Sequence, residues 1–127
     1  MHLLTSQPAT KLHSQLDGVG ISRESKHAGR EGITLHPDDA RARGLVAGDV
    51  VRVFNARSAC LAVVACDTGI VRGVVRMPVG SWYDPESFSA ERPLDKSGNP
   101  NVLTRDAGTS RLAQGCSAQT ALVFVEK

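Results

Sequence analysis

Two short runs of uncharged polar residues are the parts of this sequence best suited to bind a ligand. Residues 5–7 are Thr-Ser-Gln and residues 13–15 are His-Ser-Gln. Hydroxyl, imidazole and amide groups both donate and accept hydrogen bonds, which suits the uncharged polar edge of a ligand. A lone histidine is also common as a surface or core-edge residue, and Ser ahead of Pro8 is common in turns. The residues alone leave both interpretations open.

Catalytic and metal-binding patterns are missing from the sequence. No Ser/His/Asp set occurs, and Cys60, Cys66 and Cys116 form no CxxC pair, which argues against a structural zinc site. The three cysteines are expected to be small buried hydrophobic residues. Asp38 and Asp39 form a carboxylate pair, but their place in the first turn of a helix accounts for them. We therefore assign no catalytic residue and no metal ligand.

The elements that position these residues are mostly short strands. One helix over 38–43 is indicated by Pro37 near its start and by Gly44 after its last turn. Residues 101–104 are typical of a short strand or turn, and residues 105–115 of a loop with a helical turn. Apolar and β-branched runs predict strands at 2–5, 33–35, 50–54, 59–66, 74–78 and 118–125.

Two connections exceed 15 residues, 6–32 and 80–100. A loop of this length in a compact domain is usually functional or disordered. The polar residues gathered in 6–32 favour a functional loop. Short strands with irregular connections predict a small, mainly β barrel that carries its function on loops.

Composition excludes several classes of function. The chain has 127 residues, which fits one domain, and 15 Lys+Arg against 13 Asp+Glu give a net charge of +2. Its arginines are scattered, whereas a nucleic-acid-binding protein concentrates them on one face. No stretch approaches the ~20 apolar residues of a membrane span. The odd number of cysteines favours a reducing compartment.

Three segments together resemble a known family: TSQPATKLHSQ (5–15), LHPDDARARGLVAGDVVRV (35–53) and GNPNVLTRDAGTSRLAQGCSAQTALV (98–123). The segment GSWYDP (80–85) agrees with them. The chain is similar to the C-terminal domain of the dimethyl sulfoxide reductase family of molybdoenzymes, and within it to the biotin sulfoxide reductase and trimethylamine N-oxide reductase branch. The resemblance runs from about residue 2 to residue 125, nearly the whole chain.

The resemblance implies a fold, a cofactor and partners. The fold is a double-psi β-barrel of the aspartate-decarboxylase-like kind with one or two short helices, formed by residues 1–127 as one domain of a larger enzyme. That enzyme holds bis(molybdopterin guanine dinucleotide) molybdenum and reduces S- or N-oxides. Its molybdenum-ligating serine lies far upstream. This domain would position the cofactor beside the remaining domains and be inactive alone. The cysteines favour a cytoplasmic location for the enzyme, with the periplasm left open.

The resemblance also assigns residues to the cofactor. It places the loop that begins with the first polar run over the cofactor. It matches Asn101 to an asparagine that faces the cofactor, and Gln114 to a polar or basic residue that contacts the pterin. Asn99 is expected to be structural, and Trp82 and Tyr83 to pack against the rest of the enzyme. The predicted cofactor-binding residues are Thr5, Ser6, His13, Ser14, Gln15, Asn101 and Gln114.

Two alternatives fit the sequence less well. The chain could be a free-standing small barrel subunit of a multi-chain molybdenum or tungsten enzyme, acting as an interaction protein. It could also be a self-processing enzyme like the aspartate decarboxylases, which needs a Gly-Ser junction and a catalytic base. Gly80-Ser81 supplies the junction, but Trp82 follows it and the sequence shows no Lys or Tyr partner.

Overall fold

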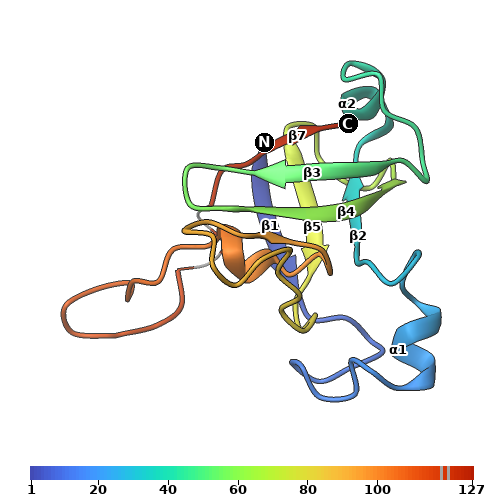
Figure 1. The fold of residues 1–127 in the computed structure, drawn as a ribbon. Coiled ribbons are helices and arrows are strands. Elements are labelled where there is room, and N and C mark those ends of the chain that lie inside the picture. The colour runs from blue at the N-terminus through green and yellow to red at the C-terminus, as the bar shows by residue number, and fades with distance from the viewer. Residues whose placement is uncertain (118, 120) are drawn as a thin grey trace.

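The computed structural model describes residues 1–117, 119 and 121–127, which form a mainly β, mixed sheet (Figure 1). Its strands are β1 (His2–Ser6), β2 (Gly32–Leu35), β3 (Val50–Phe54), β4 (Ala59–Cys66), β5 (Val74–Pro78), β6 (Leu94–Asp95) and β7 (Phe124–Glu126). The helices are α1 (Gly20–Glu24), α2 (Pro37–Arg41) and the 3-10 helix η1 (Pro100–Leu103).

The sheet runs in the order β1-β5-β2-β4-β3-β7, with β6 beside β4. The pairs β1–β5, β2–β4 and β4–β6 are parallel, and β2–β5, β3–β4 and β3–β7 are antiparallel. The two ends of this order also meet. His2 bridges Leu122, and the Val123 N–H donates to the Met1 carbonyl at 2.9 Å, just before β7 begins. The sheet therefore closes on itself, which protects strand edges that would otherwise be exposed.

Aliphatic side chains fill the inside of the closed sheet. They come from alternate positions of the strands, because successive side chains of a strand point to opposite faces. Leu3, Ile33, Val53, Met77 and Leu103 are fully buried and belong to one cluster. With only one Trp, one Tyr and three Phe in the chain, the core depends on Val, Leu, Ile and Met.

The helix predicted over 38–43 is confirmed as α2, shifted slightly toward the N-terminus. Pro37 occupies its first turn, and the His36 ring nitrogen Nδ1 accepts the Asp38 N–H at 3.1 Å. Gly44 adopts a φ of +66° just beyond the helix, which a glycine tolerates without steric cost. The six predicted strands are all present, although their ends differ.

Several predictions of local structure are wrong. Residues 6–32 are not a structureless loop, since they include α1, whose single turn is too short to show a helical period. Residues 101–104 are neither strand nor turn, because the Asn99 side chain caps η1 there. The last strand begins only at Phe124, and its predicted residues Ala118 and Thr120 lie outside the described residues. Residues 105–115 contain bends and no helix.

The cysteine prediction holds for one residue of three. Cys60 is fully buried, and burial, with the nearby Asp95 carboxylate, raises the pKa of its thiol to about 12. Cys66 and Cys116 are exposed, contrary to the prediction. Cys66 is the last residue of β4, where the strand leaves the core.

Two isoleucines test where the core lies. Ile33→Ala is expected to lower the free energy of unfolding by about 2–5 kcal/mol, because it leaves a cavity among fully buried side chains. Ile21→Ala is the matched control, since Ile21 is 61% exposed on α1, and its effect should stay within about 0.5 kcal/mol. Urea unfolding measures both. Equal losses of unfolding free energy in the two variants would show that Ile33 is not in the core.

Candidate functional site

A cavity of about 500 Å³ opens where three loops meet beside η1. The first loop follows β1, the second follows β5 and the third leads into η1. Because β1 and β5 pair in parallel, their C-terminal ends deliver the first two loops to the same edge of the sheet. The lining residues are His13, Ser14, Val79, Gly80, Ser81, Trp82, Tyr83, Asn99 and Asn101.

The lining is polar but contains no carboxylate. It offers an imidazole, hydroxyls and two amides, which both donate and accept hydrogen bonds. Trp82 and Tyr83, which also line the cavity, are 62% and 47% exposed. Aromatic rings with accessible faces stack on planar groups. The cavity is therefore suited to a polar heterocycle, and it does not repel phosphate.

Three of the seven predicted residues line this cavity together: His13, Ser14 and Asn101. They come from opposite ends of the chain, so the fold brings them together. Asn99 is buried, and its side chain accepts the Asn101 N–H at 3.0 Å. That contact is the structural role predicted for Asn99.

The other four predicted residues lie elsewhere. Thr5 is engaged by Gln119, whose side chain accepts the Thr5 N–H at 2.8 Å and donates to the Thr5 hydroxyl at 2.8 Å. Ser6 lines a second cavity, of about 400 Å³. Gln15 is on an exposed turn closed by its N–H to the Leu12 carbonyl at 2.9 Å, and it lines neither cavity.

Gln114 lies on the long exposed arm between η1 and β7, which projects from the body in Figure 1. Its side chain donates to the Ser110 carbonyl at 3.0 Å and faces a separate hollow shared with Arg105. Within the described residues, the structure thus spreads the predicted set over several places.

Close backbone packing joins the first two loops. His13 and Gly80 both have a left-handed backbone, with φ of +51° and +95°. A Cβ atom on Gly80 would lie 1.7 Å from the His13 carbonyl oxygen. Only glycine permits this approach, so Gly80 sets the distance between two walls of the cavity.

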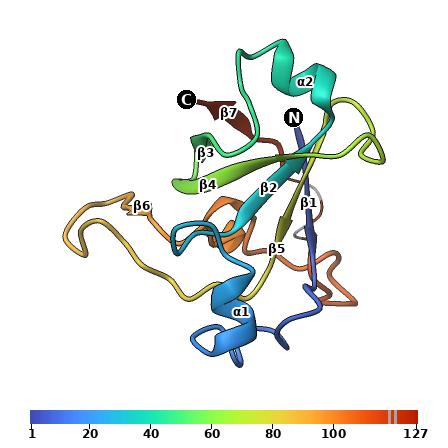
Figure 2. The same cartoon turned by 90° about the vertical axis from the view of Figure 1, so that its right-hand side faces the viewer.

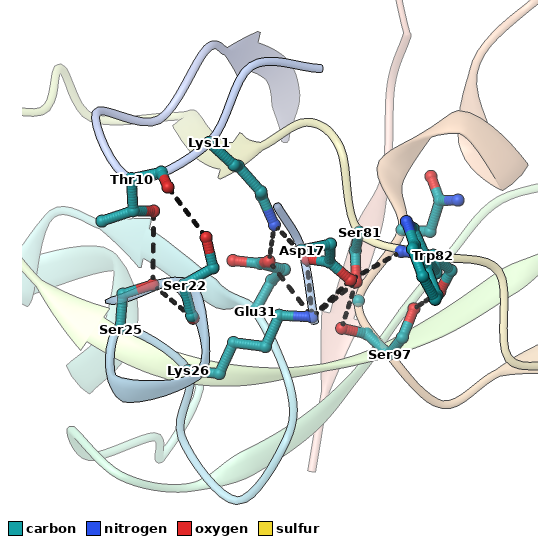
Figure 3. A network of polar contacts seen from close by, with 12 residues as sticks. Thr10, Lys11, Asp17, Ser22, Ser25, Lys26, Glu31, Ser81, Trp82 and Ser97 are labelled. Carbon is teal, nitrogen blue, oxygen red and sulfur yellow. Dashed lines mark hydrogen bonds and ion pairs between the residues drawn. The ribbon is translucent and has the colours of Figure 1, made fainter. Parts of the chain in front are cut away.

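Behind the cavity lies a buried cluster of four charged side chains, Lys11, Asp17, Lys26 and Glu31 (Figure 3). Lys11 Nζ donates to Asp17 Oδ1 at 2.6 Å and also to Glu31, and Lys26 Nζ lies 2.8 Å from Asp17 Oδ1. None of these side chains is more than 9% exposed. Two positive and two negative charges balance, which a buried cluster requires.

Asp17 connects this cluster to the cavity. Its Oδ2 accepts the backbone N–H of Trp82 at 3.0 Å, and the Trp82 indole N–H donates to the Ser14 carbonyl at 2.8 Å. Burial alone would raise the pKa of Asp17, but hydrogen bonds from Lys11, Lys26 and Trp82 outweigh it and hold that pKa below its usual value.

Asp95 anchors the third loop. It is fully buried and accepts the N–H groups of Asp84, Gly98 and Asn99 at 2.9, 2.9 and 2.7 Å. Ser97 Oγ lies 3.0 Å from Oδ1 of the same carboxylate. One side chain thereby holds both the segment after Trp82 and the start of η1.

The self-processing alternative gains no support from the site. The structure does supply the lysine that the sequence did not reveal, since Lys26 Nζ lies 3.4 Å from Ser81 Oγ. That ammonium group donates to Asp17, however, which leaves it a donor rather than a base. Ser81 is buried, and its hydroxyl donates to the Ser97 carbonyl at 3.2 Å.

The sequence analysis missed most of this network. Trp82 and Tyr83, which were expected to pack against the rest of an enzyme, line the cavity, and that expectation stays a prediction. The charged cluster shows no local pattern, because its members are separated by up to twenty positions and meet only in the fold. Within the described residues, no His, Cys, Asp and Glu side chains gather as a metal site. Among the same residues, no helix could span a membrane.

Comparison with known proteins assigns the family. A family model described as the molydopterin dinucleotide binding domain matches residues 1–122. This chain belongs to that family. It is 48% identical over 126 residues to biotin sulfoxide reductase of Cereibacter sphaeroides, covering 99% of this chain and 16% of that protein. It is 45% identical over 127 residues to dimethyl sulfoxide/trimethylamine N-oxide reductase of Rhodobacter capsulatus, covering 100% of this chain and 15% of that protein.

The chain is also 47% identical over 128 residues to trimethylamine-N-oxide reductase 1 of Escherichia coli K12, covering 100% of this chain and 15% of that protein. The chain spans about one sixth of the length of these relatives. Among solved structures, acetylene hydratase from Pelobacter acetylenicus has a similar fold, with a TM-score of 0.76 at 19% identity, covering 100% of this chain and 18% of that chain.

The cavity fits the group for which the molydopterin dinucleotide binding domain is named. A pterin or guanine edge needs groups that donate and accept side by side, as the Asn101 amide does. Its phosphates need surroundings without carboxylates, and the lining has none. Of the residues that line the cavity, His13, Ser14 and Asn101 would hold such a group by hydrogen bonds.

Gly80→Ala should separate the first two loops. Its left-handed backbone alone costs an alanine about 1–2 kcal/mol, and displacing the His13 carbonyl adds about 1–3 kcal/mol. Gly73→Ala is the control, because Gly73 has a similar φ of +82° but open space around its Cβ position. The free energies of unfolding are compared in urea. Equal losses for the two variants would contradict the close contact.

The lowered pKa of Asp17 predicts a pH dependence. A carboxylate whose pKa is depressed by folding stabilises the protein above its unfolded pKa of about 3.9 and loses that contribution as pH falls through its folded value. The gap in unfolding free energy between the parent and Asp17→Asn should therefore be constant above about pH 5 and shrink below about pH 4. A gap that stays constant down to about pH 2 would show that Asp17 is not stabilised by its partners.

Proposed function

We propose that this chain is one domain of a molybdenum-dependent S- or N-oxide reductase, where it helps to bind bis(molybdopterin guanine dinucleotide). The relatives named biotin sulfoxide reductase and dimethyl sulfoxide/trimethylamine N-oxide reductase support this activity. In these relatives the matching segment is part of a much longer chain, which favours a domain over a free-standing subunit. The remaining domains of that enzyme and a small S- or N-oxide are the partners proposed.

The observation that carries the proposal is the meeting of His13, Ser14 and Asn101 in one cavity that lacks carboxylates. When bound, the cofactor supplies the two-electron chemistry that removes an oxygen atom from the oxide. The domain's own part is to bind and orient. Ser14 and Asn101 offer hydrogen bonds to a group in the cavity, and Trp82 and Tyr83 offer ring faces. No residue of this chain is proposed to move a proton or to ligate molybdenum.

We also propose that the closed sheet is a double-psi β-barrel. Its parallel pairs β1–β5 and β2–β4, combined with closure between His2 and Leu122, support that topology. The exposed thiol of Cys66 supports a cytoplasmic location for the enzyme, because exposed thiols persist in reducing compartments.

The test measures cofactor content in the full-length enzyme that contains this domain. Asn101→Ala and His13→Ala should each lower the molybdenum and the GMP recovered per polypeptide after acid hydrolysis, because each removes a hydrogen bond of about 1 kcal/mol. Gln15→Ala is the control, since Gln15 was predicted from the sequence but lies outside the cavity. Parental content in both cavity variants would contradict the proposal.

A further inference from the structure

The charged cluster behind the cavity controls the shape of the loop that contributes His13 and Ser14. Lys11 and Asp17 stand on either side of that loop, and their 2.6 Å ion pair closes it (Figure 3). The loop itself buries little apolar surface, since Leu12 and Leu16 are exposed. Its conformation therefore depends on the ion pair and on Glu31, the residue just before β2, which accepts a hydrogen bond from Lys11.

Trp82 is held at three points, one of which is the charged cluster. Its backbone N–H donates to Asp17, its indole N–H donates to the Ser14 carbonyl, and its own carbonyl accepts the Ser97 hydroxyl at 2.6 Å. The side chain remains largely exposed in the cavity. Trp82 is thus fixed at its backbone and at its ring nitrogen, while its ring face stays accessible to a ligand in the cavity.

The geometry at Asp17 goes beyond what charge balance requires. Two lysines and two acids would balance with any arrangement of their oxygen atoms, and apolar residues of similar volume often replace such clusters without loss of stability. Here Asp17 Oδ1 accepts from Lys11, while Oδ2 accepts both from Lys26 Nζ at 2.9 Å and from the Trp82 N–H. One carboxylate thereby joins the loop after β1 to the loop after β5.

We propose that Asp17 is a positioning residue that fixes Trp82 and Ser14 as one wall of the cavity, with Lys11, Lys26 and Glu31 holding Asp17 in place. The consequence for the cofactor rests on the proposed function. A wall that is already ordered loses less conformational freedom on binding, which raises affinity. Asp17 touches no ligand itself and acts through Trp82.

The first experiment uses the single tryptophan of the chain, which gives one indole N–H signal in a nitrogen-15 NMR spectrum. Asp17→Asn leaves one acceptor oxygen, for which the Lys11 and Lys26 ammonium groups compete with the Trp82 N–H. The stronger charge-assisted bonds hold that oxygen on the lysines, so the amide NH2 group faces the Trp82 N–H and Trp82 loses its acceptor. The order parameter of the indole N–H should fall from ~0.85 to below ~0.6 in the 127-residue chain.

Asp39→Asn is the matched control. Asp39 is also buried and accepts a backbone N–H, that of Gly73 at 2.6 Å. It lies on α2, at the end of the sheet opposite α1 (Figure 2). An indole that stays rigid in Asp17→Asn, or that loosens equally in Asp39→Asn, would overturn the proposal.

A double variant covers the case in which Asp17→Asn does not fold. Asp17→Ala with Lys26→Met removes one charge of each sign and leaves Lys11 paired with Glu31. The cluster stays neutral while Trp82 loses its acceptor. The indole should again become mobile, and a rigid indole in this folded variant would equally overturn the proposal.

The second experiment measures cofactor release from the full-length enzyme. Asp17→Asn should speed release by about tenfold, a loss of the size seen at metal sites when a residue that positions a ligand is removed. Asn101→Ala serves as the reference for the proposed function. Faster release in Asn101→Ala but not in Asp17→Asn would defeat the positioning role alone. Unchanged release in both would defeat the proposed function, and the positioning role with it.

Discussion

The buried ion pair between Lys11 and Asp17 is the interaction on which the candidate site depends. Ordering a residue costs about 1–2 kcal/mol in backbone entropy, and the segment between β1 and β2 has few buried apolar side chains to offset it. The buried residues of this segment are all polar: Lys11, Asp17, Ser22 and Glu31. A satisfied polar network must therefore order this segment, as the hydrophobic core orders the strands inside the sheet. Its main effect is to select one conformation of the segment, and its contribution to the free energy of unfolding is smaller.

The sheet and the network act on the same loops from two sides. Parallel pairing of β1 with β5 brings the loops after both strands to one edge, and Ser6 and Val79 are already joined by a 2.9 Å hydrogen bond where they leave it. Gly80 then allows the two backbones to touch. Asp17 and Asp95 hold the outer segments with carboxylates that accept backbone N–H groups. The cavity is thus built mainly from backbone positions, which side-chain substitutions on its surface would leave in place.

The sequence was most informative where structure is local. Strands such as β3 and β4 were predictable because β-branched and apolar runs act over a few residues, and α2 because Pro37 and Gly44 mark its ends. The family resemblance pointed to His13, Ser14 and Asn101, which do meet. It also pointed to Gln15, which follows Ser14 on the same turn but lines neither cavity. The charged cluster has no sequence signal at all, since it exists only after distant segments pack.

The cavity is open, and the chain spans about one sixth of the length of its relatives, which limits how tightly this domain can bind a ligand by itself. Association of a ligand costs about 4–15 kcal/mol in lost freedom, whereas each hydrogen bond from this domain contributes about 1 kcal/mol net. His13, Ser14 and Asn101 cannot meet that cost by themselves, even with the ring faces of Trp82 and Tyr83 added. Tight binding of a dinucleotide therefore requires donors from outside this domain. The exposed aromatic wall, held rigid from behind, is suited to serve as one side of a site that other domains complete.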